Sequence, residues 1–198
     1  MTARLVVLAS GGGSNLQAII DACAAGRLDA AVHLVVTDRG AVGALDRAVR
    51  HRVECQVVTA VPGRDRHEYD AALADIVAQS QPDYVVLAGW RRLLTMAFLG
   101  RFPGQVINLH PALPGDLPGL HAIERAHAEA QAGSRDHTGV MVHFVPDEGV
   151  DDGPVIATHR VEINVGDSLA SLQARIHATE HELLIVALHS VLASGGFP

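Results

Sequence analysis

Short apolar runs alternate with amphipathic stretches along the first 110 residues, and this alternation constrains the fold more than any other feature. The apolar runs have the length of strands, and the stretches between them carry apolar residues at helical spacing. We expect strands at residues 4–9, 32–37, 56–59, 84–88 and 105–109, and helices at residues 15–25, 41–50, 65–79 and 96–99. Such an alternation predicts an α/β fold in which a parallel sheet carries helices on both faces.

The pattern changes after residue 110, where a loop rich in Pro and Gly occupies residues 111–119. Beyond it the sequence predicts a helix at 121–132, strands at 139–145 and 154–163, and a long last helix at 168–193 that Asp167 or Ser168 caps. We expect the two late strands to extend the sheet as an antiparallel hairpin-like unit. No internal repeat or linker divides the sequence, so we expect a single domain over residues 1–198.

The composition narrows the functional classes. The sequence has only two cysteines, no apolar run of the roughly 18 residues that a membrane helix needs, and no signal-peptide pattern. We therefore expect a cytoplasmic protein with no membrane partner. The formal charge of −7, without a basic tail, argues against nucleic-acid binding. Small-molecule partners are expected, and the sequence leaves monomer and homodimer open.

Two polar side chains end an otherwise apolar strand. Asn108 and His110 are two residues apart, so strand alternation points both to the same face of the sheet. An amide that can donate and an imidazole that can carry a proton are suited to stabilising an oxygen that becomes negative during a reaction. The alternative is a histidine whose polar atoms are satisfied by a neighbouring loop.

Three consecutive glycines, Gly11 to Gly13, follow the first expected strand and precede the first helix. Free backbone amides at such a helix start attract phosphate, and Ser14 and Asn15 add side-chain donors. The dinucleotide fingerprint fails because Leu16 stands where its third glycine is needed. The loop therefore indicates a site for one terminal phosphate, or else only a tight turn between strand and helix.

An acidic segment, residues 147–154, connects the two late strands. Its Asp and Gly residues are typical of a solvated turn. Alternatively, one of its carboxylates reaches the histidine at the strand end, orients the ring and raises the pKa of the imidazole by favouring the charged form. Spacing alone does not decide which carboxylate would do so.

Four motifs together make the chain resemble the glycinamide ribonucleotide formyltransferases, a folate-dependent family of purine biosynthesis. The resemblance covers nearly the whole chain and rests on residues 9–20, 86–90, 107–111 and 143–156. It implies a formyltransferase-type Rossmann-like sheet, with antiparallel strands added in the C-terminal part. It also implies formyl transfer from 10-formyltetrahydrofolate to the amine of the ribonucleotide, without a metal.

The resemblance also implies roles for particular residues. Asn108, His110 and Asp151 match the catalytic residues of the family. Residues 1–110 would hold the nucleotide phosphate, and residues 111–198 would complete the folate and catalytic sites. Contacts to the ribonucleotide are implied for Gly13, Ser14, Asn15, Pro111 and Glu180, and contacts to the folate for Arg66, Arg91, Arg92, Leu93, Leu94, Val145 and Asp147. His177 stands where relatives carry other polar residues.

The loop after His110 departs from the family pattern. Leu113 is followed at once by Pro114 and Gly115, and Asp116 stands where relatives often have a neutral or basic residue. The conformation of residues 111–119 therefore does not follow from the resemblance.

Other functional classes stay open at this point. Residues 177–181 match the H-x-x-E-H pattern of some zinc peptidases, and Asp38 after the second strand could hold the ribose of a nicotinamide cofactor. A ligand-binding relative without catalysis is a further alternative. Two related enzymes are nearer alternatives, a formyltetrahydrofolate hydrolase and a methionyl-tRNA formyltransferase. Members of those two families usually carry an additional domain at one end.

Overall fold

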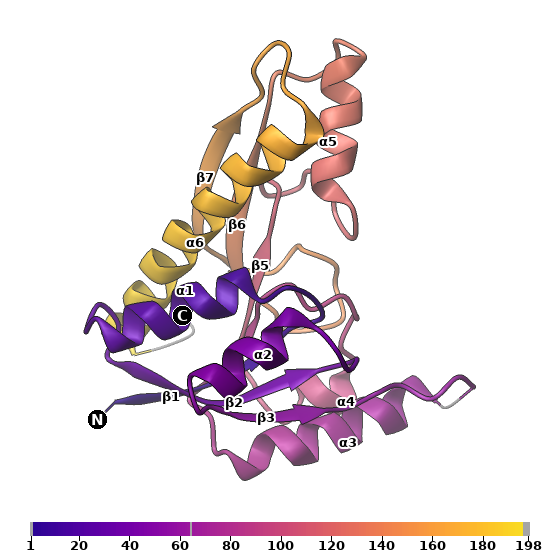
Figure 1. Cartoon of the computed structure of the whole chain (residues 1–198). Coiled ribbons are helices and arrows are strands. Elements are labelled where there is room, and N and C mark those ends of the chain that lie inside the picture. Colours follow the sequence, from indigo (N-terminus) through magenta and orange to yellow (C-terminus); the bar gives the residue numbers. More distant parts are fainter. Residues whose placement is uncertain (1, 64, 196–198) are drawn as a thin grey trace.

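One seven-stranded sheet organises the chain in the computed structural model, which describes residues 2–63 and 65–195 (Figure 1). Its strands lie in the spatial order β3 (Glu54–Val57), β2 (Ala30–Thr37), β1 (Ala3–Leu8), β4 (Tyr84–Leu87), β5 (Val106–His110), β6 (His137–Phe144) and β7 (Val155–Glu162). The pairs among the first five strands are parallel, and the pairs β5–β6 and β6–β7 are antiparallel. The predicted fold class, a sheet that is parallel in its N-terminal half with antiparallel strands added later, is confirmed. The prediction of a single domain over residues 1–198 stays a prediction.

All seven strands lie within two residues of the expected ranges, because each is marked locally by a run of apolar residues. Leu5 to Leu8 are all buried, as the inner strand of a sheet covered on both faces requires.

Helices cover both faces of the sheet (Figure 1). One core cluster packs the sheet against α1, α2 and α6, and a second packs its other face against α3 and α4. Asp65 caps α3 and Ser168 caps α6, each accepting a hydrogen bond from a backbone amide of the first turn. The helices are α1 (Ser14–Ala24), α2 (Gly43–Arg50), α3 (Arg66–Gln79), α4 (Met96–Leu99), α5 (Ala122–Gln131) and α6 (Leu169–Ser194).

The strand order reverses at β1, which lies between β2 and β4. In open α/β sheets a crevice forms at the carboxyl ends of the strands where this reversal occurs. The glycine loop leaves β1 at this point, and the Ser10 amide donates a hydrogen bond to the Gly89 carbonyl after β4. The sheet therefore brings the ends of β1, β4 and β5 to one edge, where a ligand can reach them.

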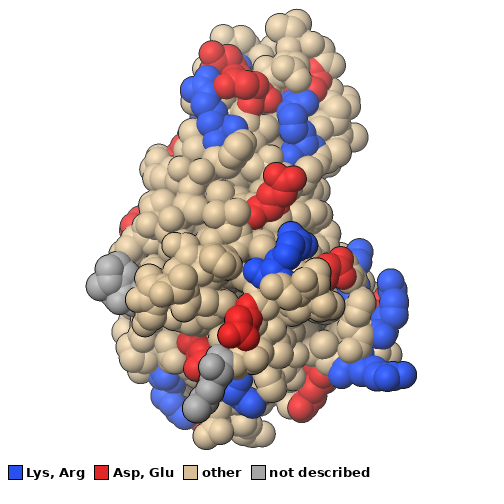
Figure 2. Space-filling model, turned by 90° about the vertical axis from the view of Figure 1, so that its left-hand side faces the viewer, with Lys and Arg blue, Asp and Glu red and all other residues tan. Residues whose placement is uncertain are grey.

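Charges of both signs are interspersed on the face seen in Figure 2, among a larger number of uncharged side chains. Acidic and basic side chains gather together at its upper end, which in Figure 1 holds the start of α6. The negative net charge is therefore not concentrated in a single acidic patch on this face. Among residues 2–63 and 65–195, no helix combines the length and apolar character that crossing a membrane requires.

The long helix α6 offers a matched test of core packing. Leu184 is fully buried against the sheet, whereas the Val186 side chain is 62% exposed on the same helix. We expect Leu184→Ala to lower the free energy of unfolding by about 2–5 kcal/mol, because it removes buried methyl groups and leaves a cavity. Val186→Ala should change it by less than about 0.5 kcal/mol. Denaturant unfolding of both variants checks this, and equal losses would contradict the packing described.

Candidate active site

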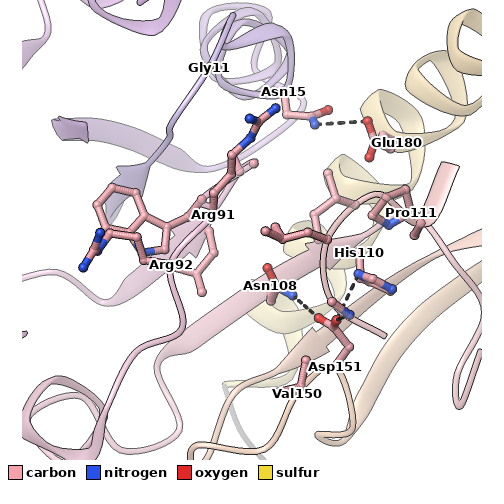
Figure 3. Close-up of a pocket in the computed structure, with 18 of the residues that line it drawn as sticks. Gly11, Asn15, Arg91, Arg92, Asn108, His110, Pro111, Val150, Asp151 and Glu180 are labelled. Atoms are coloured by element: carbon pink, nitrogen blue, oxygen red, sulfur yellow. Dashed lines mark hydrogen bonds and ion pairs between the residues drawn. The ribbon is translucent and has the colours of Figure 1, made fainter. Parts of the chain in front are cut away.

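A cavity of about 790 Å³ opens at the carboxyl ends of the parallel strands (Figure 3). This volume lies in the range of small-molecule sites. Its wall joins the glycine loop, the ends of β4 and β5, the loop 111–119, the acidic connection after β6 and one face of α6. All the residues predicted for the site line this cavity except Arg66, which is exposed at the start of α3 and is not among the lining residues.

The carboxylate of Asp151 lies at the centre of the polar contacts in this cavity (Figure 3). Asn108 Nδ2 donates to Asp151 Oδ1 at 3.0 Å, and the Gly119 amide donates to Oδ2 at 2.7 Å. His110 Nδ1 lies 3.2 Å from Oδ2. Asp151 is therefore the residue of the acidic connection that reaches the strand-end histidine, a choice that spacing alone left open and that the family resemblance implied.

Two physical features hold Asp151 as an ionised group in a fixed position. Burial by itself raises the pKa of Asp151, but the side chain of His143, the Gly119 amide and the two neighbouring imidazoles together keep it below its usual value. Its backbone has φ 54°, in the left-handed region that Asp and Asn tolerate better than most residues. Asn is therefore the substitution at this position that removes the charge and still fits the backbone.

His110 is almost fully buried, and each of its ring nitrogens faces an acceptor. Nδ1 faces Asp151, and Nε2 lies 3.1 Å from the Leu117 carbonyl oxygen. As predicted, the Asp151 carboxylate acts to raise the pKa of His110, but the expectation that it keeps the ring charged was wrong. Burial lowers the pKa of His110 more than Asp151 and the Leu117 carbonyl raise it, because the ring has lost most of its contact with water. The ring is therefore mainly uncharged at neutral pH.

His143 is a site residue that reasoning from the sequence missed. It lies directly opposite Asn108 in the antiparallel pair β5–β6 and is only 2% exposed. Its Nδ1–H donates to the Phe144 carbonyl at 2.8 Å, so its Nε2 is free to accept from Asn108 Nδ2 at 3.1 Å. The sequence signals were a histidine within an apolar strand and its place at the start of one motif of the resemblance, but its partner depends on strand register.

The glycine loop is shaped by close packing against α2. Gly13 has φ 73°, and a Cβ atom there would lie 2.7 Å from the Ala44 Cα atom, so a side chain does not fit. The chain turns into α1 at Ser14 with its first amides available, as a phosphate site requires. Arg47 Nε donates to the Gly12 carbonyl at 2.9 Å and braces the loop from outside.

Asn15 and Glu180 meet across the cavity although they are far apart in sequence (Figure 3). Asn15 Nδ2 donates to Glu180 Oε2 at 3.3 Å, and His177 Nδ1 lies 2.7 Å from the same oxygen. The hydrogen bond with Glu180 raises the pKa of His177. The Asn15 side-chain oxygen is buried and has no hydrogen-bond partner among the described residues.

The opposite wall carries most of the residues predicted for the folate. Arg91, Arg92, Leu93 and Leu94 follow β4, and Val145 and Asp147 follow β6. The Arg91 amide donates to Ser10 Oγ at 3.1 Å, and the Arg92 guanidinium lies 4.7 Å from the centre of the Tyr69 ring. Glu148 Oε1 accepts from the Met96 amide at 2.8 Å, which ties the acidic connection to this wall.

The zinc-peptidase pattern at residues 177–181 does not form a recognisable metal centre. Glu180 is buried and engaged by His177 and Asn15. Within the part of the chain that the structure describes, no group of three or more His, Cys, Asp or Glu side chains is arranged to hold a metal ion.

Comparisons with known proteins point to one family. A family model described as formyl transferase matches residues 3–188. The chain is 43% identical to a phosphoribosylglycinamide formyltransferase of Schizosaccharomyces pombe, over 97% of this chain and 98% of the relative. It is 38% identical to the Escherichia coli protein of that name, over 91% of this chain and 82% of the relative. The crystal structure of phosphoribosylglycinamide formyltransferase from Bacillus halodurans superposes on this chain with a TM-score of 0.90 at 36% identity. The match covers 97% of this chain and 96% of that structure.

The electrostatic balance at His110 can be measured directly. Asp151→Asn removes the carboxylate whose charge favours the protonated ring, so the pKa of His110 should fall further below its usual value. Titration of the ring signals by NMR measures this. Asp152→Asn, which changes the exposed neighbouring carboxylate, is the matched control and should leave the pKa of His110 unchanged. A rise in Asp151→Asn would contradict the balance described.

Proposed function

The chain belongs to the formyl transferase family, and on that premise we propose that it is a phosphoribosylglycinamide formyltransferase. It transfers the formyl group of 10-formyltetrahydrofolate to the amine of N1-(5-phosphoribosyl)glycinamide, a step of purine biosynthesis. The products are the formylated ribonucleotide and tetrahydrofolate. The observation that carries the proposal is a single cavity that joins a glycine loop suited to phosphate with the cluster of Asn108, His110 and Asp151.

The two ends of the cavity suit the two substrates. The amides at the start of α1 bind the phosphate, and Glu180 accepts hydrogen bonds from the sugar hydroxyls. The pterin lies against Leu93 and Leu94 and the backbone of the wall that follows β4. Arg66, which lies outside the cavity, contacts only the far end of the folate, where its glutamate is exposed. This arrangement places the amine and the formyl group near the strand-end residues.

The chemistry requires an oxygen to become negative and a proton to move. The amine attacks the formyl carbon, the carbonyl electron pair moves to oxygen, and the bond from carbon to N10 of the folate then breaks. Protonated His110 stabilises the oxyanion by its positive charge, and Asn108 does so by turning an amide hydrogen from Asp151 or His143 to the oxygen. The loss of one such stabilising group lowers turnover by a factor of roughly 10²–10³. The proton lost by the amine is delivered to N10, with Asp151 and His110 holding it near the reacting atoms.

His110 changes its charge during this sequence. Before the reaction it is mainly uncharged, because burial lowers its pKa. The oxyanion favours the protonated ring, and both N–H groups then find acceptors in Asp151 and the Leu117 carbonyl. The site is thus built to receive a proton when the intermediate forms.

The remaining expectations concern partners and surroundings. The protein works in the cytoplasm on small molecules, as a monomer or a homodimer, without binding nucleic acid or a membrane. Hydrolysis of the folate is the nearest alternative reaction, since the same oxyanion would form if water replaced the amine. A ligand-binding relative without turnover is the alternative outside enzymes.

Product analysis separates these possibilities. Purified protein with both substrates should release tetrahydrofolate and the formylated ribonucleotide, and omission of the ribonucleotide should abolish release. Formate appearing without the ribonucleotide would indicate the hydrolase, and binding of both ligands without products would indicate the non-catalytic relative.

In the same assay Asp151→Asn should lower kcat by a factor of about 10²–10⁴, because the variant loses the carboxylate that assists proton transfer. Unchanged turnover would remove Asp151 from the mechanism.

A second prediction tests the assignment of the two cavity ends. Asn15→Ala removes the side-chain amide at the glycine loop that donates a hydrogen bond to Glu180 beside the phosphate site. We expect the Kd of the ribonucleotide to rise about 3- to 10-fold, as the loss of one hydrogen bond predicts, with the Kd of the folate unchanged. Calorimetric titration of each ligand measures both constants. Equal weakening of the two ligands would count against a phosphate site at this loop.

A further inference from the structure

The loop of residues 111–119 contacts two of the three central residues of the cavity through its backbone. The Leu117 carbonyl oxygen lies 3.1 Å from His110 Nε2, and the Gly119 amide donates to Asp151 Oδ2 at 2.7 Å. Neither contact uses a side chain of the loop. The positions of these two backbone groups, and therefore the conformation of the loop, set the surroundings of His110 and Asp151.

The loop holds this conformation against backbone strain. Leu117 has φ 44°, a left-handed value that costs free energy for a residue with a branched side chain. Such a conformation persists only where the surrounding structure fixes it by several contacts. The Leu117 side chain supplies one of these, because it is buried in a small cluster with Ala112, Ala122 and Ala126. A second contact is made by the polar residue that precedes Leu117 in the turn.

Asp116 provides that second contact. Arg135 holds its carboxylate with two hydrogen bonds, Nη1 to Oδ2 at 2.6 Å and Nη2 to Oδ1 at 2.9 Å. The Arg135 side chain is 15% exposed and that of Asp116 is 28% exposed, so water competes little for the pair. The hydrogen bonds from Arg135 lower the pKa of Asp116, which keeps the pair charged at neutral pH.

Arg135 is itself held from the other side. Its Nε donates to Glu129 Oε2 on α5 at 2.7 Å, and its Nη1 also donates to the His137 carbonyl at the start of β6 at 3.2 Å. A planar guanidinium with paired, two-point contacts fixes geometry as well as charge. The arginine therefore anchors the turn of the loop to a helix and a strand that belong to the body of the protein.

We propose that Asp116 and Arg135 are positioning residues of the formyl transfer: their ion pair holds Leu117 and Gly119 in place, and these two residues orient His110 and Asp151. The proposal rests on the proposed function for its effect on turnover. Neither side chain touches the reacting atoms, so the effect passes entirely through the loop backbone. Small displacements at a reacting centre are costly, and an error of about 1 Å reduces rates by factors approaching 10².

The test compares two variants that each remove one partner of Arg135. Asp116→Ala frees the loop, whereas Glu129→Gln removes a carboxylate charge from the same arginine and leaves the loop pair intact. We expect Asp116→Ala to lower kcat about 10- to 100-fold while the Kd of the ribonucleotide stays within about twofold of the unaltered protein. Glu129→Gln should keep kcat within about twofold. Asp116→Glu, which retains the charge, should restore part of the loss.

A readout at His110 distinguishes positioning from general loosening. The ionisable groups near the ring, Asp151, His143 and Glu180, are substituted in none of these variants, whereas Asp116→Ala weakens the contacts that Leu117 and Gly119 make with His110 and Asp151. The Leu117 carbonyl contact raises the pKa of His110, so NMR titration should show the pKa falling in Asp116→Ala and unchanged in Glu129→Gln. If Asp116→Ala does not fold, the same measurements on Asp116→Asn decide the question.

The outcomes separate this proposal from the proposed function. Unchanged kcat and His110 pKa in Asp116→Ala, or equal losses in Glu129→Gln, would overturn the positioning role. If the unaltered protein releases no product, the proposed function fails. A fall of the His110 pKa confined to the Asp116 variants would then still support the loop pair as the device that orients His110.

Discussion

The contacts of the Asp151 carboxylate are the constraint on which the site depends. Three segments meet at this one group, since it contacts Asn108 and His110 on β5 and the Gly119 amide of the following loop. Burying a carboxylate is costly unless hydrogen bonds replace its water. Each contact therefore stabilises the charged carboxylate and also holds the three segments together. Removing any one of them leaves a buried charge less well solvated, so the cluster forms as a unit.

The change from parallel to antiparallel pairing explains how the segments come together. Because β6 runs against β5, His143 lies opposite Asn108, and β6 ends at Phe144 opposite Ile107. The connection from β6 to β7 starts there and brings Asp151 to the side chains of Asn108 and His110. A seventh strand parallel to β6 would have needed a long crossover in place of this short connection. The antiparallel hairpin is thus part of the site as well as of the fold.

Features encoded over a few neighbouring residues were predictable from the sequence. The alternation of strands and helices, the glycine loop and the capping by Ser168 each depend on local patterns, and each matches the structure. The contact of His143 with Asn108 was not predictable, because it depends on the register between strands. The direction of the pKa of His110 was also missed. The sequence shows a neighbouring carboxylate but does not show how much water the fold removes from the ring.

The lowered pKa of His110 suits a group that must change its charge within one reaction cycle. If Asp151 held the ring permanently as a cation, the two residues would form an ion pair without net charge. The ring would then hold its proton tightly and pass it on with difficulty. A ring that is mainly uncharged, yet lies between two acceptors, gains a proton only when a further negative charge develops nearby. Burial opposes protonation of the ring and the surrounding acceptors favour it, so the negative charge of the intermediate acts on a ring that is already placed to hold the proton.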